Sequence, residues 1–108
     1  MISTTQALKQ VITIWEHVDL TCENAHFNLG RSMQATNEVL SQARMHDQSN
    51  SIGTLISQIE RAFKDARWEA QIKWSNQLGS IGQGLWADMH VRKQRQAALV
   101  ELLKKITL

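Results

Sequence analysis

A seven-residue hydrophobic repeat runs through the first part of the chain, over residues 4–46. Its two rows are Leu8, Trp15, Cys22, Leu29, Thr36 and Ala43, and Val11, Val18, Ala25, Ser32, Val39 and His46. Rows with this spacing lie on one side of an α-helix. The repeat therefore predicts one continuous helix over residues 4–46, about 60 Å long at roughly 1.5 Å per residue.

A break near Gly30 is the alternative to this long helix. Asn28, Ser32 and Asn37 also favour a helix poorly, and a glycine costs about 1 kcal/mol relative to alanine. The repeat keeps its phase across Gly30, which favours continuity. A break there would instead give a four-helix bundle.

A turn and a second helix follow. Residues 46–53 combine Asp, Ser, Asn and Gly, which are typical of turns. Apolar residues then recur every three or four positions, which predicts a helix over residues 52–78. The glycines that follow, Gly79, Gly82 and Gly84, predict a break or bend.

A third helix is predicted over residues 85–106. It ends in a dense apolar segment, and Lys104 and Lys105 in its last turn suit the helix dipole. The absence of proline and the low number of glycines, five, favour helices over a β fold. We therefore expect one all-α domain over residues 1–108, without a linker or second domain. It would be a long antiparallel helical hairpin or a three-helix bundle, with the four-helix bundle as the alternative.

Composition and charge narrow the function only a little. Hydrophobic residues make up 43% of the 108 residues, which excludes a disordered tail. The net charge of +2 is too small to indicate nucleic acid or an anionic membrane by itself. The single cysteine, Cys22, fits a reducing compartment, and there is neither a secretory signal nor a long apolar run. These features predict a protein that does not enter a membrane and that is cytoplasmic, with export by a route that uses no cleavable signal as the alternative.

No catalytic, metal or cofactor signature is complete. Glu23 and His26 match the Glu-x-x-His pair of carboxylate-bridged di-iron bundles, but no other histidine has a Glu three residues earlier. Cys22 and His26 lie one turn apart, which by itself falls short of a nucleophilic site. We therefore expect a protein that is not an enzyme and uses no metal or cofactor.

His26 and Gly30 resemble the phospho-accepting histidine, and the glycine four residues later, of histidine phosphotransfer domains. Those domains are helical bundles of about this size, so the resemblance implies a phosphotransfer role for His26. The chain has Leu29 where those domains usually carry a lysine, and Asn28 where they carry an apolar residue. The resemblance therefore covers two residues only.

Basic residues interspersed with tryptophans suggest a nucleic-acid-binding accessory protein as an alternative. On the second and third predicted helices they are Arg61, Lys64, Arg67, Arg92, Lys93 and Arg95. Cationic and aromatic side chains together can hold a single nucleic-acid strand. However, acidic residues such as Glu60 lie among them, in spacings typical of a solvated helix.

The leading interpretation concerns apolar residues that lie away from the predicted stripes. Trp68 and Ile72 lie opposite the stripe of the second helix, and Leu20 and Phe27 lie farthest from that of the first. Such residues suit a protein contact better than water, although burial within a single bundle is the alternative. We therefore expect a protein–protein interaction module (adaptor, assembly chaperone, anti-factor or structural subunit) that self-associates, as a homodimer or a higher assembly.

Overall fold

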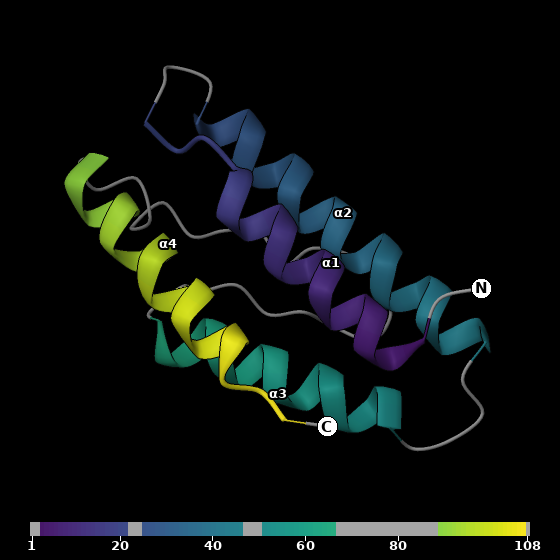
Figure 1. The fold of residues 1–108 in the computed structure, drawn as a ribbon. Coiled ribbons are helices and arrows are strands. Elements are labelled where there is room, and N and C mark those ends of the chain that lie inside the picture. Colours follow the sequence, from purple (N-terminus) through teal and green to yellow (C-terminus); the bar gives the residue numbers. More distant parts are fainter. Residues whose placement is uncertain (1–2, 22–24, 47–50, 67–88, 108) are drawn as a thin grey trace.

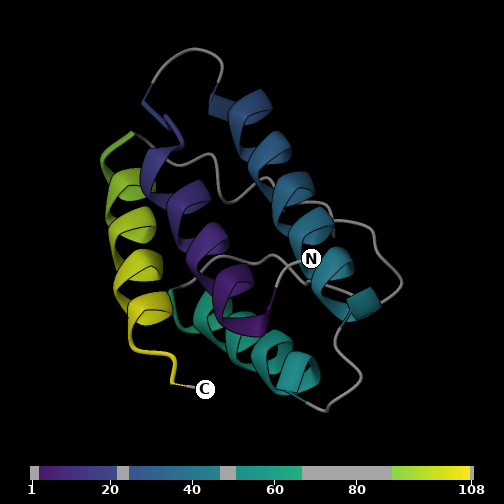
Figure 2. The same ribbon diagram turned by 45° about the vertical axis from the view of Figure 1, so that its right-hand side comes forward.

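The computed structural model describes residues 3–21, 25–46, 51–66 and 89–107. In these residues the regular structure is entirely helical, which confirms the all-α prediction. The four helices are α1 (Thr4–His17), α2 (Ala25–His46), α3 (Ser51–Asp65) and α4 (Met89–Lys104). Helix α1 lies between α2 and α4, and α3 crosses one end of this layer (Figures 1 and 2). Helix α4 thus folds back beside α1 and also packs on α3.

Helix α1 begins with a capping box. The Ser3 hydroxyl accepts a hydrogen bond from the Gln6 backbone N–H at 3.1 Å, and the Gln6 side-chain oxygen accepts one from the Ser3 N–H at 2.9 Å. The two side chains satisfy donors that an unpaired helix start would leave open. The sequence around Ser3 therefore fixes where α1 starts.

The prediction of a continuous helix over residues 4–46 is wrong. Val18, after the end of α1, has an extended backbone with φ −68° and ψ 131°. The Asp19 carboxylate accepts hydrogen bonds from the Thr21 backbone N–H at 2.9 Å and from the Thr21 hydroxyl at 2.7 Å. Such local side-chain bonds offer the backbone an alternative to the helix. The longest dimension of the molecule is accordingly only 41 Å.

The four-helix alternative expected the break near Gly30, but the structure has no break there. Gly30 lies inside α2 on its exposed side, and apart from the adjoining residues and backbone of α2 no atom lies within 4 Å of the position that a Cβ would take. Four helices do occur in the described residues, as in that alternative, but the first interruption falls between His17 and Ala25.

The later helices agree with their predictions where the structure describes them. Helix α3 covers the first part of the predicted 52–78 helix, and α4 lies within the predicted 85–106 helix. The predicted end of the former, the start of the latter and Gly79, Gly82 and Gly84 fall in residues 67–88, outside the described residues.

Trp15 joins three helices at the centre of the core. Its side chain is fully buried, and its ring meets Phe63 of α3 edge-on, with the centroids 5.1 Å apart. Its indole N–H donates to the hydroxyl of Thr36 on α2 at 3.0 Å, and that hydroxyl donates to the Ser32 carbonyl at 2.8 Å. The indole thus has a partner for its only polar group, as a buried tryptophan requires.

Helix α4 is attached to the end of α1 by both apolar and polar contacts. Leu99 and Leu103 are fully buried in the shared core. The Gln96 side-chain amide donates to the carbonyl oxygens of Trp15 at 2.8 Å and of Val18 at 2.9 Å. Gln96 therefore provides hydrogen bonds to carbonyls at the end of α1, where the helix itself supplies no donors.

Candidate protein-interaction surface

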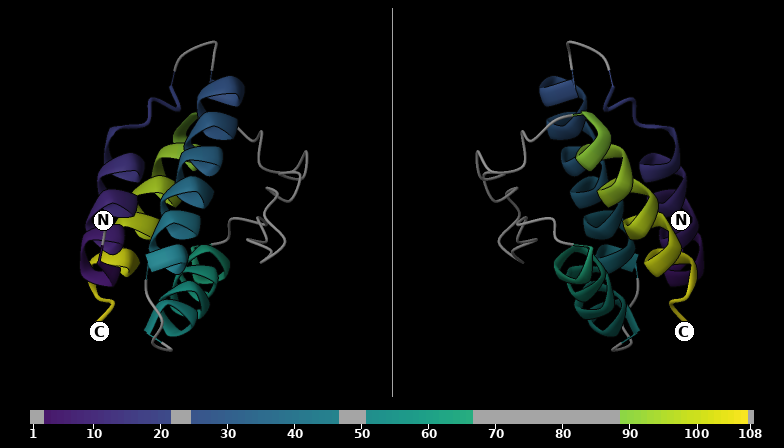
Figure 3. Two further views of the ribbon diagram at one scale, coloured as in Figure 1. Left: turned by 90° about the vertical axis from the view of Figure 1, so that its right-hand side faces the viewer. Right: turned by 90° about the vertical axis from the view of Figure 1, so that its left-hand side faces the viewer.

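Helix α2 has one covered face and one open face. The buried residues of the covered face are Ala25, Leu29, Ser32, Met33, Thr36, Leu40 and Ala43. The exposed residues on the opposite side include Phe27, Gly30, Arg31, Gln34, Glu38, Ser41, Gln42 and Met45. Helix α2 packs on α1 and α3, and Figure 3 shows it at the periphery of the bundle. Its outer face is therefore open along its length.

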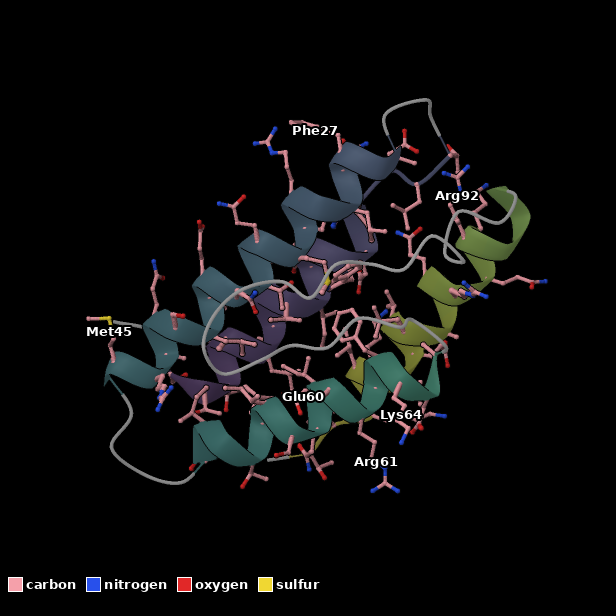
Figure 4. All side chains as sticks on the ribbon, turned by 180° about the vertical axis from the view of Figure 1, so that it is seen from behind. Phe27, Met45, Glu60, Arg61, Lys64 and Arg92 are labelled. Atoms are coloured by element: carbon pink, nitrogen blue, oxygen red, sulfur yellow. The ribbon has the colours of Figure 1, made fainter. Side chains whose placement is uncertain are left out.

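Two large apolar side chains stand on this outer face. Phe27 is 62% exposed and Met45 is 80% exposed. They are 18 residues apart, which is five helical turns, so they lie on the same side of α2 about 27 Å from each other. Figure 4 shows them projecting outward at opposite ends of the helix. We call the line of Phe27, Arg31, Gln34, Glu38, Ser41 and Met45 the outer stripe.

Phe27 has an aromatic–cation contact at the surface. The Arg31 guanidinium carbon lies 5.5 Å from the centroid of the Phe27 ring. At an exposed site such a contact contributes about 0.5–1 kcal/mol. The contact favours one orientation of the ring, and it places a positive charge next to the apolar end of the outer stripe.

The predicted contact residues have different locations in the structure. Leu20, expected to face a partner, is only 1% exposed and belongs to the core cluster, so this expectation is corrected. Because α1 ends at His17, Leu20 leaves the helical phase and turns inward. Phe27 is exposed, as its position in the repeat suggested. Trp68 and Ile72 lie outside the described residues.

Sequence reasoning missed Met45. In the seven-residue repeat, Phe27 takes the position farthest from the two apolar rows and Met45 takes a different one, so the repeat does not relate them. At about 3.6 residues per turn, the 18-residue spacing from Phe27 puts both side chains on one line of the helix. That spacing is the signal that could have identified it.

An open pocket lies between α3 and the end of α4. Its volume is about 260 Å³, and it is lined by Gln58, Arg61, Ala62, Asp65, Leu102, Lys105, Ile106 and Thr107. The lining contains no histidine or cysteine, and the Arg61 guanidinium lies 4.0 Å from the Asp65 carboxylate on the same helix. At this size it is slightly below the range of typical small-molecule sites.

The described basic residues of the nucleic-acid alternative lie in two separate places. Arg61 and Lys64 project from α3, whereas Arg92 lies near the start of α4 (Figure 4). Lys93 is exposed, and Arg92 and Arg95 are half-buried. Arg67 lies outside the described residues, so the proposed set of six remains a prediction.

Candidate metal and phosphotransfer residues receive no further support. Among the side chains that the structure describes, no group of three or more His, Cys, Asp or Glu is placed to hold a metal ion. Cys22, Glu23 and the side chain of His26 are outside that part.

None of the described helices is long and apolar enough to cross a lipid bilayer.

The chain matches no model of a known protein family, no curated protein and no solved structure.

Proposed function

We propose that this protein is a small, non-enzymatic helical module that binds another polypeptide through the outer stripe of α2. Adaptors, assembly chaperones, anti-factors and structural subunits that bind through a helical face would all fit this description. The supporting observation is the pair of large apolar side chains, Phe27 and Met45, at 62% and 80% exposure on one line of α2. A cytoplasmic location is part of the proposal, since the lone Cys22 fits a reducing compartment.

The energy available from this surface is modest. Burying the side chain of Phe27 or Met45 contributes about 1.5–3 kcal/mol each before the losses of association are subtracted. Two anchors at the ends of a largely polar stripe therefore favour reversible binding, in which both anchors are needed. Trp68 and Ile72 remain predicted contact residues that would add to this affinity.

Partner capture from an extract of the native host tests the proposal. The wild-type protein and the variant Phe27→Ser with Met45→Ser would be immobilised, and the retained proteins quantified by mass spectrometry. We expect specifically retained partners to fall at least about tenfold in the variant, equivalent to a loss of about 1.4 kcal/mol. Both changes are on the solvent side of α2, so the circular dichroism spectrum should stay unchanged.

The matched control is Ala97→Ser with Ala98→Ser. These two residues are exposed on α4, so the control also replaces surface apolar groups with hydroxyls. The control should retain partners like the wild type. Equal retention by wild type, stripe variant and control would contradict binding through the outer stripe.

A further inference from the structure

The outer stripe carries opposite charges on the two sides of its centre at the level of Thr36, with Arg31 five residues before it and Glu38 two residues after it. Arg31 lies between Phe27 and the middle of α2, and Glu38 lies just beyond the middle, toward Met45. Both charged side chains are exposed. The midpoint of Phe27 and Met45 is at the level of Thr36, and the exposed pair Gln34 and Glu38 has the same midpoint. Two copies of a stripe with this arrangement can be complementary to each other when they run antiparallel about a two-fold axis.

The charges decide between the two possible orientations of such a pair. If two copies of α2 lay parallel, each residue would be level with itself, so Arg31 would approach Arg31 and Glu38 would approach Glu38. If they lay antiparallel, Arg31 would be within about one helical turn of Glu38 of the second copy, on the same side of the contact. Opposite charges across a contact favour the antiparallel arrangement, and like charges oppose the parallel one.

The apolar ends meet in the same arrangement. Antiparallel pairing about the level of Thr36 puts Phe27 beside Met45 of the second copy, at both ends of the contact. A thioether sulfur packs favourably at the edge of an aromatic ring. The small residues Gly30 and Ser41 also become neighbours across the contact, which lets the two helices approach closely. Stripe positions separated alternately by four and three residues suit two helices that cross at about 20°.

We infer that the occupant of the outer stripe is a second copy of this chain, with the two α2 helices antiparallel. The inference rests on the proposed function, since it names the polypeptide that this surface binds. The contact consists of two Phe27–Met45 pairs flanking two Arg31–Glu38 pairs. Because a 22-residue helix offers one narrow face, the dimer is weak and reversible.

Analytical ultracentrifugation of the full chain over a concentration series tests the inference. At about 100 µM we expect a substantial dimer fraction, as for a small transient interface. The reversals Arg31→Glu and Glu38→Arg should each raise the dimer dissociation constant at least about tenfold, because each creates like-charge contacts. The double reversal should return it to within about threefold of the wild type. Lys93→Glu, on the exposed side of α4, is the charge-reversal control and should leave it unchanged.

Cross-linking tests the orientation independently. In a Cys22→Ser background, Gly30→Cys and Ser41→Cys would be mixed and oxidised, so that the introduced thiols are the only ones in the chain. The antiparallel contact predicts that the mixed disulfide exceeds both self-disulfides. A predominance of self-disulfides would overturn the orientation.

A wild-type protein that stays monomeric at about 100 µM would overturn the inference altogether. So would a double reversal that is as weak as the single ones. These outcomes are distinct from failure of the proposed function: a monomer whose partner capture still depends on Phe27 and Met45 would refute self-association alone.

Discussion

The hydroxyl of Thr36 has two roles in the core. It accepts from the indole N–H of Trp15 at 3.0 Å and donates to the Ser32 carbonyl at 2.8 Å. Thr36 and Trp15 are both fully buried. A polar pair in this environment contributes little in net terms while complete, but the loss of one member leaves the other buried without a partner.

Replacing Thr36 with valine should therefore destabilise the fold although shape and volume are nearly kept. The Trp15 N–H would lose its acceptor, and we expect the free energy of unfolding to fall by about 1–3 kcal/mol. Urea unfolding followed by far-ultraviolet circular dichroism measures this. Tryptophan fluorescence is less suitable, because the chain contains four tryptophans.

The control for this prediction is Thr13→Val. The Thr13 hydroxyl donates to the Lys9 carbonyl at 3.0 Å on the exposed side of α1, so its loss is compensated by water. Its effect should stay within about 0.5 kcal/mol. Combining Thr36→Val with Trp15→Phe removes both members of the buried pair, and the double variant should be more stable than the sum of the single effects predicts. Additive effects would contradict the role assigned to the hydrogen bond.

At the scale of elements, the continuity of α2 through Gly30 has a measurable consequence. Gly30 is exposed within the helix, and a Cβ added there would meet no atom within 4 Å beyond the adjoining residues and backbone of α2. Gly30→Ala should therefore raise the free energy of unfolding by about 0.5–1 kcal/mol, since alanine favours the helix more and restricts the unfolded chain. Urea unfolding with an unchanged dependence on denaturant would verify it.

Gly30→Pro gives the opposite test at the same position. Inside a helix proline removes a backbone hydrogen bond and clashes with the preceding turn, so we expect a loss of about 3 kcal/mol. If the chain instead bent at residue 30, proline would be tolerated and alanine would have little effect. That pair of results would contradict an unbroken α2.

The predicted helix over residues 4–46 is interrupted after His17, and the physical cause lies in residues 18–21. The hydrophobic repeat measures which side of a helix is apolar, and it keeps its phase whether or not the helix is continuous. The turn at Asp19 and Thr21 is built from side-chain hydrogen bonds, without the glycine or proline that usually marks a break. Helix type and the core position of Trp15 could therefore be predicted, whereas the place of the break could not.

The helical pattern and its interruption after α1 also explain which residues of the interaction surface could be predicted from the sequence. The exposure of Phe27 was anticipated from its position opposite the stripe, and α2 retains that phase. Leu20 was misjudged because it lies in the turn after α1 instead of on a helix. Met45 was missed because the seven-residue repeat gives it a different position from Phe27, whereas at about 3.6 residues per turn the 18 residues between them bring the two into line.

At the scale of the whole molecule, α3 carries polar side chains that the fold partly removes from water. The side-chain oxygen of Gln58 is buried and has no hydrogen-bond partner among the described residues. The neighbouring Glu60 is half-buried on α3 (Figure 4), and burial raises the pKa of its carboxyl above the ordinary value of 4.5. Folding therefore disfavours the charged form of Glu60.

This raised pKa predicts how stability depends on pH. Above the folded-state pKa, Glu60 is ionised in both states, and the folded state carries the full desolvation penalty. As the pH falls through the folded-state pKa toward 4.5, the folded protein binds the proton first and the penalty is lost. Glu60→Gln, which is neutral at every pH, should therefore unfold at a higher temperature than the wild type at pH 7. The difference should shrink and vanish below pH 4.5.

Thermal unfolding by circular dichroism at a series of pH values measures this difference. Glu101→Gln is the matched control, because Glu101 lies on the exposed side of α4 and loses little hydration on folding. A Glu60→Gln variant that is less stable than the wild type at pH 7 would mean that the carboxylate makes a favourable interaction which outweighs its burial. A stabilisation that persisted unchanged below pH 4.5 would instead assign the effect to packing of the amide, since no charge would remain to be relieved.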